Sequence, residues 1–179
     1  MKFTIYLVFY VLFGFVPQAA GSAICLYSLN RQSLFSKSFW VTTIIYSLIS
    51  TSIRLAYDYG VIDFGFHTII IWMIFIVIAI FYNKFPVIQS TVSILVSGLF
   101  IAIAELITAI VFVIAWGTEF FNNVMNNTQT IDDKILKAAC GIPGNFLFVI
   151  LAFVFYVVAK KRYERKQLES ANEGKEQNT

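Results

Sequence analysis

Residues 86 to 116, PVIQSTVSILVSGLFIAIAELITAIVFVIAW, form the longest apolar run of the chain and contain one ionisable side chain, Glu105. A helix that rises about 1.5 Å per residue crosses the roughly 30 Å of membrane hydrocarbon with about 20 residues. This run exceeds a perpendicular crossing by about ten residues, so we expect a helix that tilts, bends or protrudes. Two short re-entrant helices are the alternative, although only Gly98 interrupts the middle of the run.

Four further apolar stretches surround this run, at about residues 3–29, 38–57, 66–82 and 135–159. Each supplies the roughly 17 residues that a membrane-crossing helix needs at least. Of the 179 residues, 59% are hydrophobic and 13% are charged, whereas soluble domains are roughly 45–50% apolar and about 25% charged. The sequence therefore predicts an all-α polytopic membrane bundle with five transmembrane helices over residues 1–162. We expect the polar residues 163–179 to form a short disordered cytoplasmic tail.

The charges of the loops predict the orientation of the bundle, because Lys and Arg accumulate on the cytoplasmic side of membrane proteins. The loops after the first, third and fifth predicted helices are basic, and the other two are mainly acidic. The basic residues are Arg31, Lys37, Lys84, Lys160, Lys161, Arg162, Arg165 and Lys166, and the acidic ones are Asp58, Asp63, Glu119, Asp132 and Asp133. We therefore expect the amino terminus outside and the carboxyl terminus inside.

The first apolar stretch also resembles a secretory leader, because Lys2 precedes an apolar run and the small residues 19–23 resemble a cleavage site. Cleavage would leave four helices and place the basic tail outside, against the positive-inside rule. The apolar run also continues beyond the site, through Ile24 to Leu29. We therefore expect this stretch to remain as the first membrane helix.

Several residues predict departures from regular helices. Pro17 should kink the first helix, and the small residues 19–23 should let another helix pack closely against it. Gly141, Pro143 and Gly144 should break the last helix near its outer end. In the outer loop, apolar residues at positions 120, 121, 124 and 125 have the spacing of a short amphipathic helix on the membrane surface. A disordered Asn-rich loop is the alternative there.

Ionisable residues within the predicted helices are the candidate ligand-binding residues, because a charge in hydrocarbon costs at least ~2.5 kcal/mol unless it has a partner, water or a function. Arg54 and Glu105 lie about 24 and 28 Å from the cytoplasmic ends of their helices. His67 and Lys137 open their helices from the outside. We predict that the four residues meet in an outward-opening polar cavity, with Arg54 pairing with Glu105. The alternative is a static ion pair, with His67 and Lys137 reaching into the interface.

Other functions have less support in the sequence. A proton relay would need ionisable residues leading inward, where the helices offer only Gln18 and Gln89. Cys25 and Cys140 should lie near opposite faces, too far apart for a disulfide, and with a single His they make no metal site. The net charge of +3 reflects residues 160–166 rather than a surface for nucleic acid. Because no catalytic or phosphate-binding motif is present, we expect neither an enzyme nor a cofactor.

The segments IIYSLI at 44–49 and FGFHTII at 64–70, together with Arg54 and Glu105, resemble the multi-span sensor region of bacterial histidine kinases with a GHKL-type ATPase domain. The peptide-sensing accessory gene regulator kinases are the best-known members. The similarity covers residues 1–165 in layout and is specific over Arg54 to His67 and at Glu105. The chain departs from these kinases after Leu168, where a polar tail replaces the kinase core, and His67 lies outside. The resemblance implies a sensor module without a kinase domain.

Our leading interpretation is a signalling module of the bacterial cytoplasmic membrane that binds a small ligand or peptide from the outer side through Arg54, His67, Glu105 and Lys137. It would act through a membrane or cytoplasmic protein partner. One alternative is a transporter subunit similar to the substrate-capturing components of energy-coupling-factor transporters, although those usually have six helices. In that case the small residues of the first helix would dock on a coupling subunit. The other alternative is a structural assembly subunit of a membrane complex.

Overall fold

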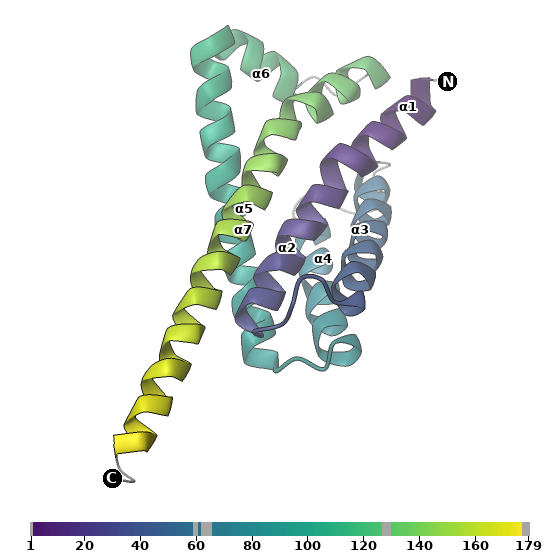
Figure 1. Cartoon of the computed structure of the whole chain (residues 1–179). Helices are drawn as coiled ribbons and strands as arrows, with labels where there is room; N and C mark the ends of the chain where they lie inside the picture. Colours follow the sequence, from purple (N-terminus) through teal and green to yellow (C-terminus); the bar gives the residue numbers. More distant parts are fainter. Residues whose placement is uncertain (1, 59–60, 62–65, 127–129, 177–179) are drawn as a thin grey trace.

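The computed structural model describes residues 2–58, 61, 66–126 and 130–176, and the regular secondary structure within them is entirely helical (Figure 1). Asp63 and the first two residues of the predicted FGFHTII motif lie outside these residues. The elements are α1 (Lys2–Phe9), the π-helical η1 (Tyr10–Phe15), α2 (Val16–Leu29), α3 (Lys37–Asp58), α4 (Phe66–Val77), the π-helical η2 (Ile78–Tyr82), α5 (Val87–Trp116), α6 (Thr118–Asn126) and α7 (Ile131–Glu176).

Four of these helical segments are long and apolar enough to cross a membrane. They are Tyr6–Leu29, Lys37–Tyr57, Val87–Trp116 and Ile131–Arg165. The helix Phe66–Tyr82, which α4 and η2 form together, is apolar but shorter. The structure therefore confirms the predicted all-α class, and its four long apolar helices fit a multi-pass membrane protein.

The long apolar run at residues 86–116 forms one uninterrupted helix of 30 residues, α5. The alternative of two short re-entrant helices is therefore wrong. At about 1.5 Å per residue it is about 45 Å long, more than the hydrocarbon thickness. In Figure 1 its second half leaves the other helices and leads to α6. Gly117 ends α5 with φ 87°, a conformation that glycine adopts without strain. This glycine lets α6 begin at Thr118.

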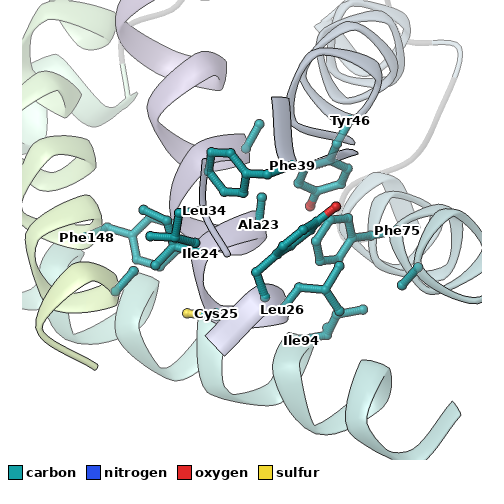
Figure 2. Packing of buried hydrophobic residues seen from close by; sticks show 14 of the residues in the cluster. Ala23, Ile24, Cys25, Leu26, Leu34, Phe39, Tyr46, Phe75, Ile94 and Phe148 are labelled. Carbon is teal, nitrogen blue, oxygen red and sulfur yellow. The ribbon is translucent and has the colours of Figure 1, made fainter. Parts of the chain in front are cut away.

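Helix α2 is the centre of the bundle, since it packs against α3, α5 and α7, and residues 21–28 are all buried. Figure 2 places Phe148 of α7 and Leu34 on one side of α2, and Phe75 and Ile94 on the other. A Cβ added at Gly21 would overlap the Phe148 ring. The close helix approach predicted for residues 19–23 is therefore confirmed, and α7 is the partner.

Pro17 is accommodated by the π-helical segment η1 that precedes it and by a polar contact with α7. A proline has no backbone N–H, so it cannot donate to the carbonyl four residues earlier, which here belongs to Phe13. The Asn145 side-chain amide of α7 donates to this carbonyl at 3.0 Å, and the Gln18 amide donates to the Asn145 Oδ1 at 3.0 Å. We call the hydrogen-bonded set of Phe13, Gln18 and Asn145 the Asn145 clasp. It supplies a donor to a carbonyl that loses its α-helical donor at Pro17.

Two predictions about the last helix are wrong. First, Gly141, Pro143 and Gly144 do not break it, because α7 runs through Pro143 without interruption. Neighbouring helices stabilise the chain there: a Cβ at Gly144 would lie 3.1 Å from the Thr108 hydroxyl of α5. Second, α7 continues to Glu176, where a disordered tail from residue 163 was expected. The Lys, Arg, Glu and Gln residues of this segment favour helix, and extending an existing helix is easier than starting one.

The outer loop contains the predicted amphipathic helix, α6, rather than a disordered segment up to residue 126. Val124 is buried in it, while Glu119 in its first turn is exposed. Its end and the start of α7 are both capped. The Thr130 hydroxyl and backbone N–H donate to the Asp133 carboxylate at 2.7 and 3.0 Å, and the Asp133 N–H donates back to the Thr130 hydroxyl at 3.1 Å. This capping box starts α7.

The contact between α2 and α7 predicts different effects for two glycines of the first helix. Gly21→Ala places a methyl group against the Phe148 ring, and overpacking of this kind typically costs about 1–3 kcal/mol. Gly14→Ala is the matched control, because a Cβ there meets nothing within 4 Å. We expect Gly21→Ala to lower the free energy of unfolding in detergent and Gly14→Ala to leave it unchanged or slightly higher. Equal effects would contradict the close α2–α7 packing.

Candidate functional site

Arg54 and Glu105, the first two predicted site residues, approach each other without forming a salt bridge. Arg54 of α3 is half-buried, and its Nε is buried with no hydrogen-bond partner among the described residues. The carboxylate of Glu105 on α5 lies within Coulomb range of Arg54. Glu105 is exposed on the surface of the chain. The pair thus combines an unused guanidinium donor with an accessible carboxylate.

His67, the third predicted residue, is buried at the start of α4. Its ring stacks on Tyr57 of α3, with the ring centroids 4.4 Å apart, and only 5% of the residue is exposed. Tyr57 follows Arg54 by three residues, so the two lie on the same face of α3. His67 therefore belongs to the contact between α3 and α4 near Arg54, and it does not extend into the interface.

Lys137, the fourth predicted residue, contacts α6 instead of the other three. Its ammonium group donates to the Met125 carbonyl at 2.8 Å, next to the last residue of α6. A cation stabilises the carboxyl end of a helix, where backbone carbonyls lack partners. Lys137 consequently attaches α6 to α7.

A small pocket lies between α6 and α7, and we call it the outer pocket because the loop charges predict that this end lies outside. It has a volume of about 120 Å³ and is lined by Phe120, Asn123, Val124, Asp133 and Leu136. Ligand pockets usually measure about 300–1,000 Å³, so this space would have to enlarge before it could hold a peptide. None of the four predicted residues lines it, although Leu136 adjoins Lys137.

A larger inner pocket of about 350 Å³ lies at the other end of the bundle, between the loop 30–36 and α7. Residues that line it include Arg31, Gln32, Lys160, Tyr163, Glu164 and Gln167. We refer to it below as the inner pocket, because the loop charges predict that this end of the bundle lies inside. Its volume falls within the range of ligand sites. Arg31 and Lys160 were predicted only to orient the bundle, because nothing local to either residue indicates that the two lie close together.

A partly buried hydrogen-bond network around Asn83 was also not predicted. The Oδ1 of Asn83, at the end of η2, accepts hydrogen bonds from the hydroxyls of Tyr27 at 2.8 Å, Ser38 at 2.6 Å and Thr42 at 3.1 Å. Its amide donates to the Thr42 hydroxyl at 2.9 Å. This network joins α2, α3 and η2 at one end of the bundle. A satisfied polar network of this kind favours one packing over others, so its role is structural.

No family model, curated protein or solved structure matches this chain. The resemblance to the sensor region of histidine kinases therefore stays a prediction from the sequence.

The contact of Lys137 with α6 predicts a local change in dynamics. Lys137→Met removes the donor to the Met125 carbonyl, so the backbone amides of α6 should exchange faster with deuterium. Lys134→Met is the control, because it removes a charge one turn earlier in α7 without touching that carbonyl. Hydrogen–deuterium exchange of residues 118–126 measures both. Unchanged protection in Lys137→Met would show that the ammonium group does not hold α6.

Proposed function

We propose that this protein is a signalling module of the bacterial cytoplasmic membrane. It receives a small carboxylate-bearing ligand or peptide from the outer side and acts through a partner protein on the inner side. The observation that carries the proposal is the course of α7, a single helix of 46 residues. Asp133 and Leu136 of α7 line the outer pocket, and Lys160 and Tyr163 of the same helix line the inner pocket. A displacement at one end can therefore reach the other through one element.

Five crossings are part of the proposal, and the pairing of Phe66–Tyr82 with α3 supports the additional one. At one end, His67 stacks on Tyr57. Midway, the rings of Tyr46 and Phe75 lie 4.2 Å apart, and at the other end Asn83 bonds to Thr42. Since α3 is long enough to cross a membrane, a helix that accompanies it from end to end covers a similar depth. The loop charges then favour an outer amino terminus and an inner carboxyl terminus.

The ligand contact is assigned to Arg54 and Glu105, with His67 supporting α3 from the side. A buried donor without an acceptor costs about 1–3 kcal/mol. A ligand carboxylate would supply the acceptor that the Nε of Arg54 lacks among the described residues, and a guanidinium group can bind it through two parallel hydrogen bonds. Glu105 would bind a cationic part of the same ligand, such as the amine of a peptide.

The packing of α5 against α7 offers a route from this site to the inner side. The Thr108 hydroxyl donates to the Ala104 carbonyl at 2.7 Å, and Gly144 of α7 lies against both groups. Ala104 precedes Glu105, and Gly144 precedes the Asn145 of the clasp. A shift of α5 at Glu105 would therefore displace α7 near Asn145, where α7 contacts the first helix.

Single-cysteine labelling tests the topology, since Cys25 and Cys140 are both buried. Val61 and Lys84 flank Phe66–Tyr82 and are exposed. We expect Val61→Cys to react with a membrane-impermeant maleimide in intact cells, and Lys84→Cys to react only after permeabilisation. Reaction of both on the same side would exclude this crossing. Thr4→Cys reports the side on which the amino terminus lies. Labelling only after permeabilisation would favour a transporter subunit with both ends in the cytoplasm.

Conservative variants of Arg54 and Glu105 test the ligand site. Arg54→Lys keeps the charge but loses the planar fork, and Glu105→Gln keeps the shape but loses the charge. We expect both to retain membrane abundance and melting temperature, because no salt bridge is broken. The measurement is the rise in melting temperature that short peptides and small carboxylates cause on binding. We expect some of these compounds to stabilise the wild type and neither variant.

The same measurement tests the alternative that Arg54 and Glu105 have only a structural role. If no compound stabilises the wild type, and both variants reduce abundance equally, Arg54 and Glu105 serve only to hold α3 and α5 together. Ser52→Ala is the control for nonspecific effects, because Ser52 is exposed, lies two residues before Arg54 and bonds within its own helix, to the Leu48 carbonyl at 2.9 Å.

A further inference from the structure

The inner pocket lies at the depth where the apolar segments end. Helix α2 ends at Leu29, immediately before the loop that forms one wall of the pocket. The apolar part of α7 ends at Ala159, which lines the pocket, and the basic run begins with Lys160. Tyr156 and Tyr163 also line it, and tyrosines are enriched where a membrane meets water. The pocket therefore lies at the level of lipid phosphates, on whichever side of the membrane this end lies.

One face of α7 forms the second wall. The lining residues of this helix occupy positions 156, 159, 160, 163, 164 and 167, which is the spacing of a single stripe along three turns. Phe153 lies one turn before Tyr156 on the same face of this helix and is 52% exposed. A molecule with a polar head in the pocket could thus lay apolar chains along α7 nearer the membrane centre.

Arg31 is held in position by its backbone and its side chain. It adopts φ 57°, a left-handed conformation at the end of α2 where glycine is the usual residue. Its backbone N–H donates to the Ser28 carbonyl at 3.2 Å, and its guanidinium carbon lies 4.3 Å above the Tyr163 ring. A non-glycine residue in this conformation is unfavourable by roughly 1–2 kcal/mol, so glycine can replace Arg31 without backbone strain.

The charges of the pocket favour an anion. Arg31 and Lys160 come from two segments far apart in the chain, and Glu164 is the one acidic residue in the lining. The Arg31 guanidinium group lies over the Tyr163 ring and is exposed, so its N–H groups are available to bind oxygen atoms. Gln32 and Ser33 add neutral hydrogen-bonding groups beside Arg31.

We propose that the inner pocket binds the phosphate group of an anionic phospholipid through Arg31 and Lys160. Basic pockets between membrane helices are the sites where such headgroups bind. The phosphate ester is the chemical group that the pocket recognises. The level of the pocket and the exposed Phe153 ring on the same face of α7 make a membrane lipid its source. This site is independent of the ligand proposed for the outer side.

The test measures binding of short-chain phosphatidylglycerol to the full-length protein in neutral detergent, with phosphatidylcholine as the zwitterionic reference. Arg31→Gly is the decisive variant, because glycine accepts φ 57° and the variant therefore folds. We expect it to bind phosphatidylglycerol about fivefold more weakly or worse, and Lys160→Gln to weaken binding similarly. Phosphatidylcholine binding should change in neither.

Lys84→Gly is the matched control. Lys84 also has φ 57° and also lies in a basic loop, but it does not line the inner pocket. We expect its affinity for phosphatidylglycerol to equal that of the wild type. An equal loss in Lys84→Gly and Arg31→Gly, or equal wild-type affinity for the two lipids, would overturn the proposal. Competition by soluble glycerol phosphate as effective as the lipid itself would overturn the lipid as its source.

Discussion

The close contact between α2 and α7 is the constraint on which the rest of the bundle depends. It needs Gly21, because any larger residue would overlap Phe148, and it is fixed in register by the Asn145 clasp. Lipid chains are as apolar as leucine side chains, so helices in a membrane associate through close packing and hydrogen bonds instead of hydrophobic burial. A small residue beside a satisfied polar contact provides both. The remaining helices pack around this pair.

The two proposed sites are formed by different helices and have different chemistry. On the outer side, the features are a donor of Arg54 that lacks a partner among the described residues and an exposed carboxylate at Glu105. On the inner side, Arg31 is fixed over Tyr163 at the edge of a cavity. A lipid bound at the inner pocket would contact α7 between Tyr156 and Gln167.

The sequence predicted what depends on local pattern. Hydropathy located the helices, including the full length of α5, and the spacing of Phe120, Phe121, Val124 and Met125 identified α6. Depth along a helix also placed Arg54 and Glu105 at a similar level, but depth does not give the direction in which a side chain points. Lys137 therefore contacts Met125 of α6 and not Glu105.

What the sequence could not supply depends on contacts between distant segments. Gln18 and Asn145 are 127 residues apart, and Tyr27 and Asn83 are 56 residues apart. For the same reason the inner pocket was not foreseen. The local rule for proline and glycine predicted a break in α7 at Pro143, but packing against Thr108 overrides it. The polar composition after residue 162 predicted disorder, whereas its helix-forming residues extend α7.

A double-mutant cycle between Gln18→Ala and Asn145→Ala tests the α2–α7 contact most directly, with the free energy of unfolding in bicelles as the readout. Hydrogen bonds between membrane helices contribute about 0.6 kcal/mol on average and up to about 1.7 kcal/mol, so we expect a coupling energy in this range. Pro17→Ala should reduce the effect of Asn145→Ala, because it restores a donor to the Phe13 carbonyl. A coupling energy of zero, with Asn145→Ala unaffected by Pro17→Ala, would contradict this account of the bundle.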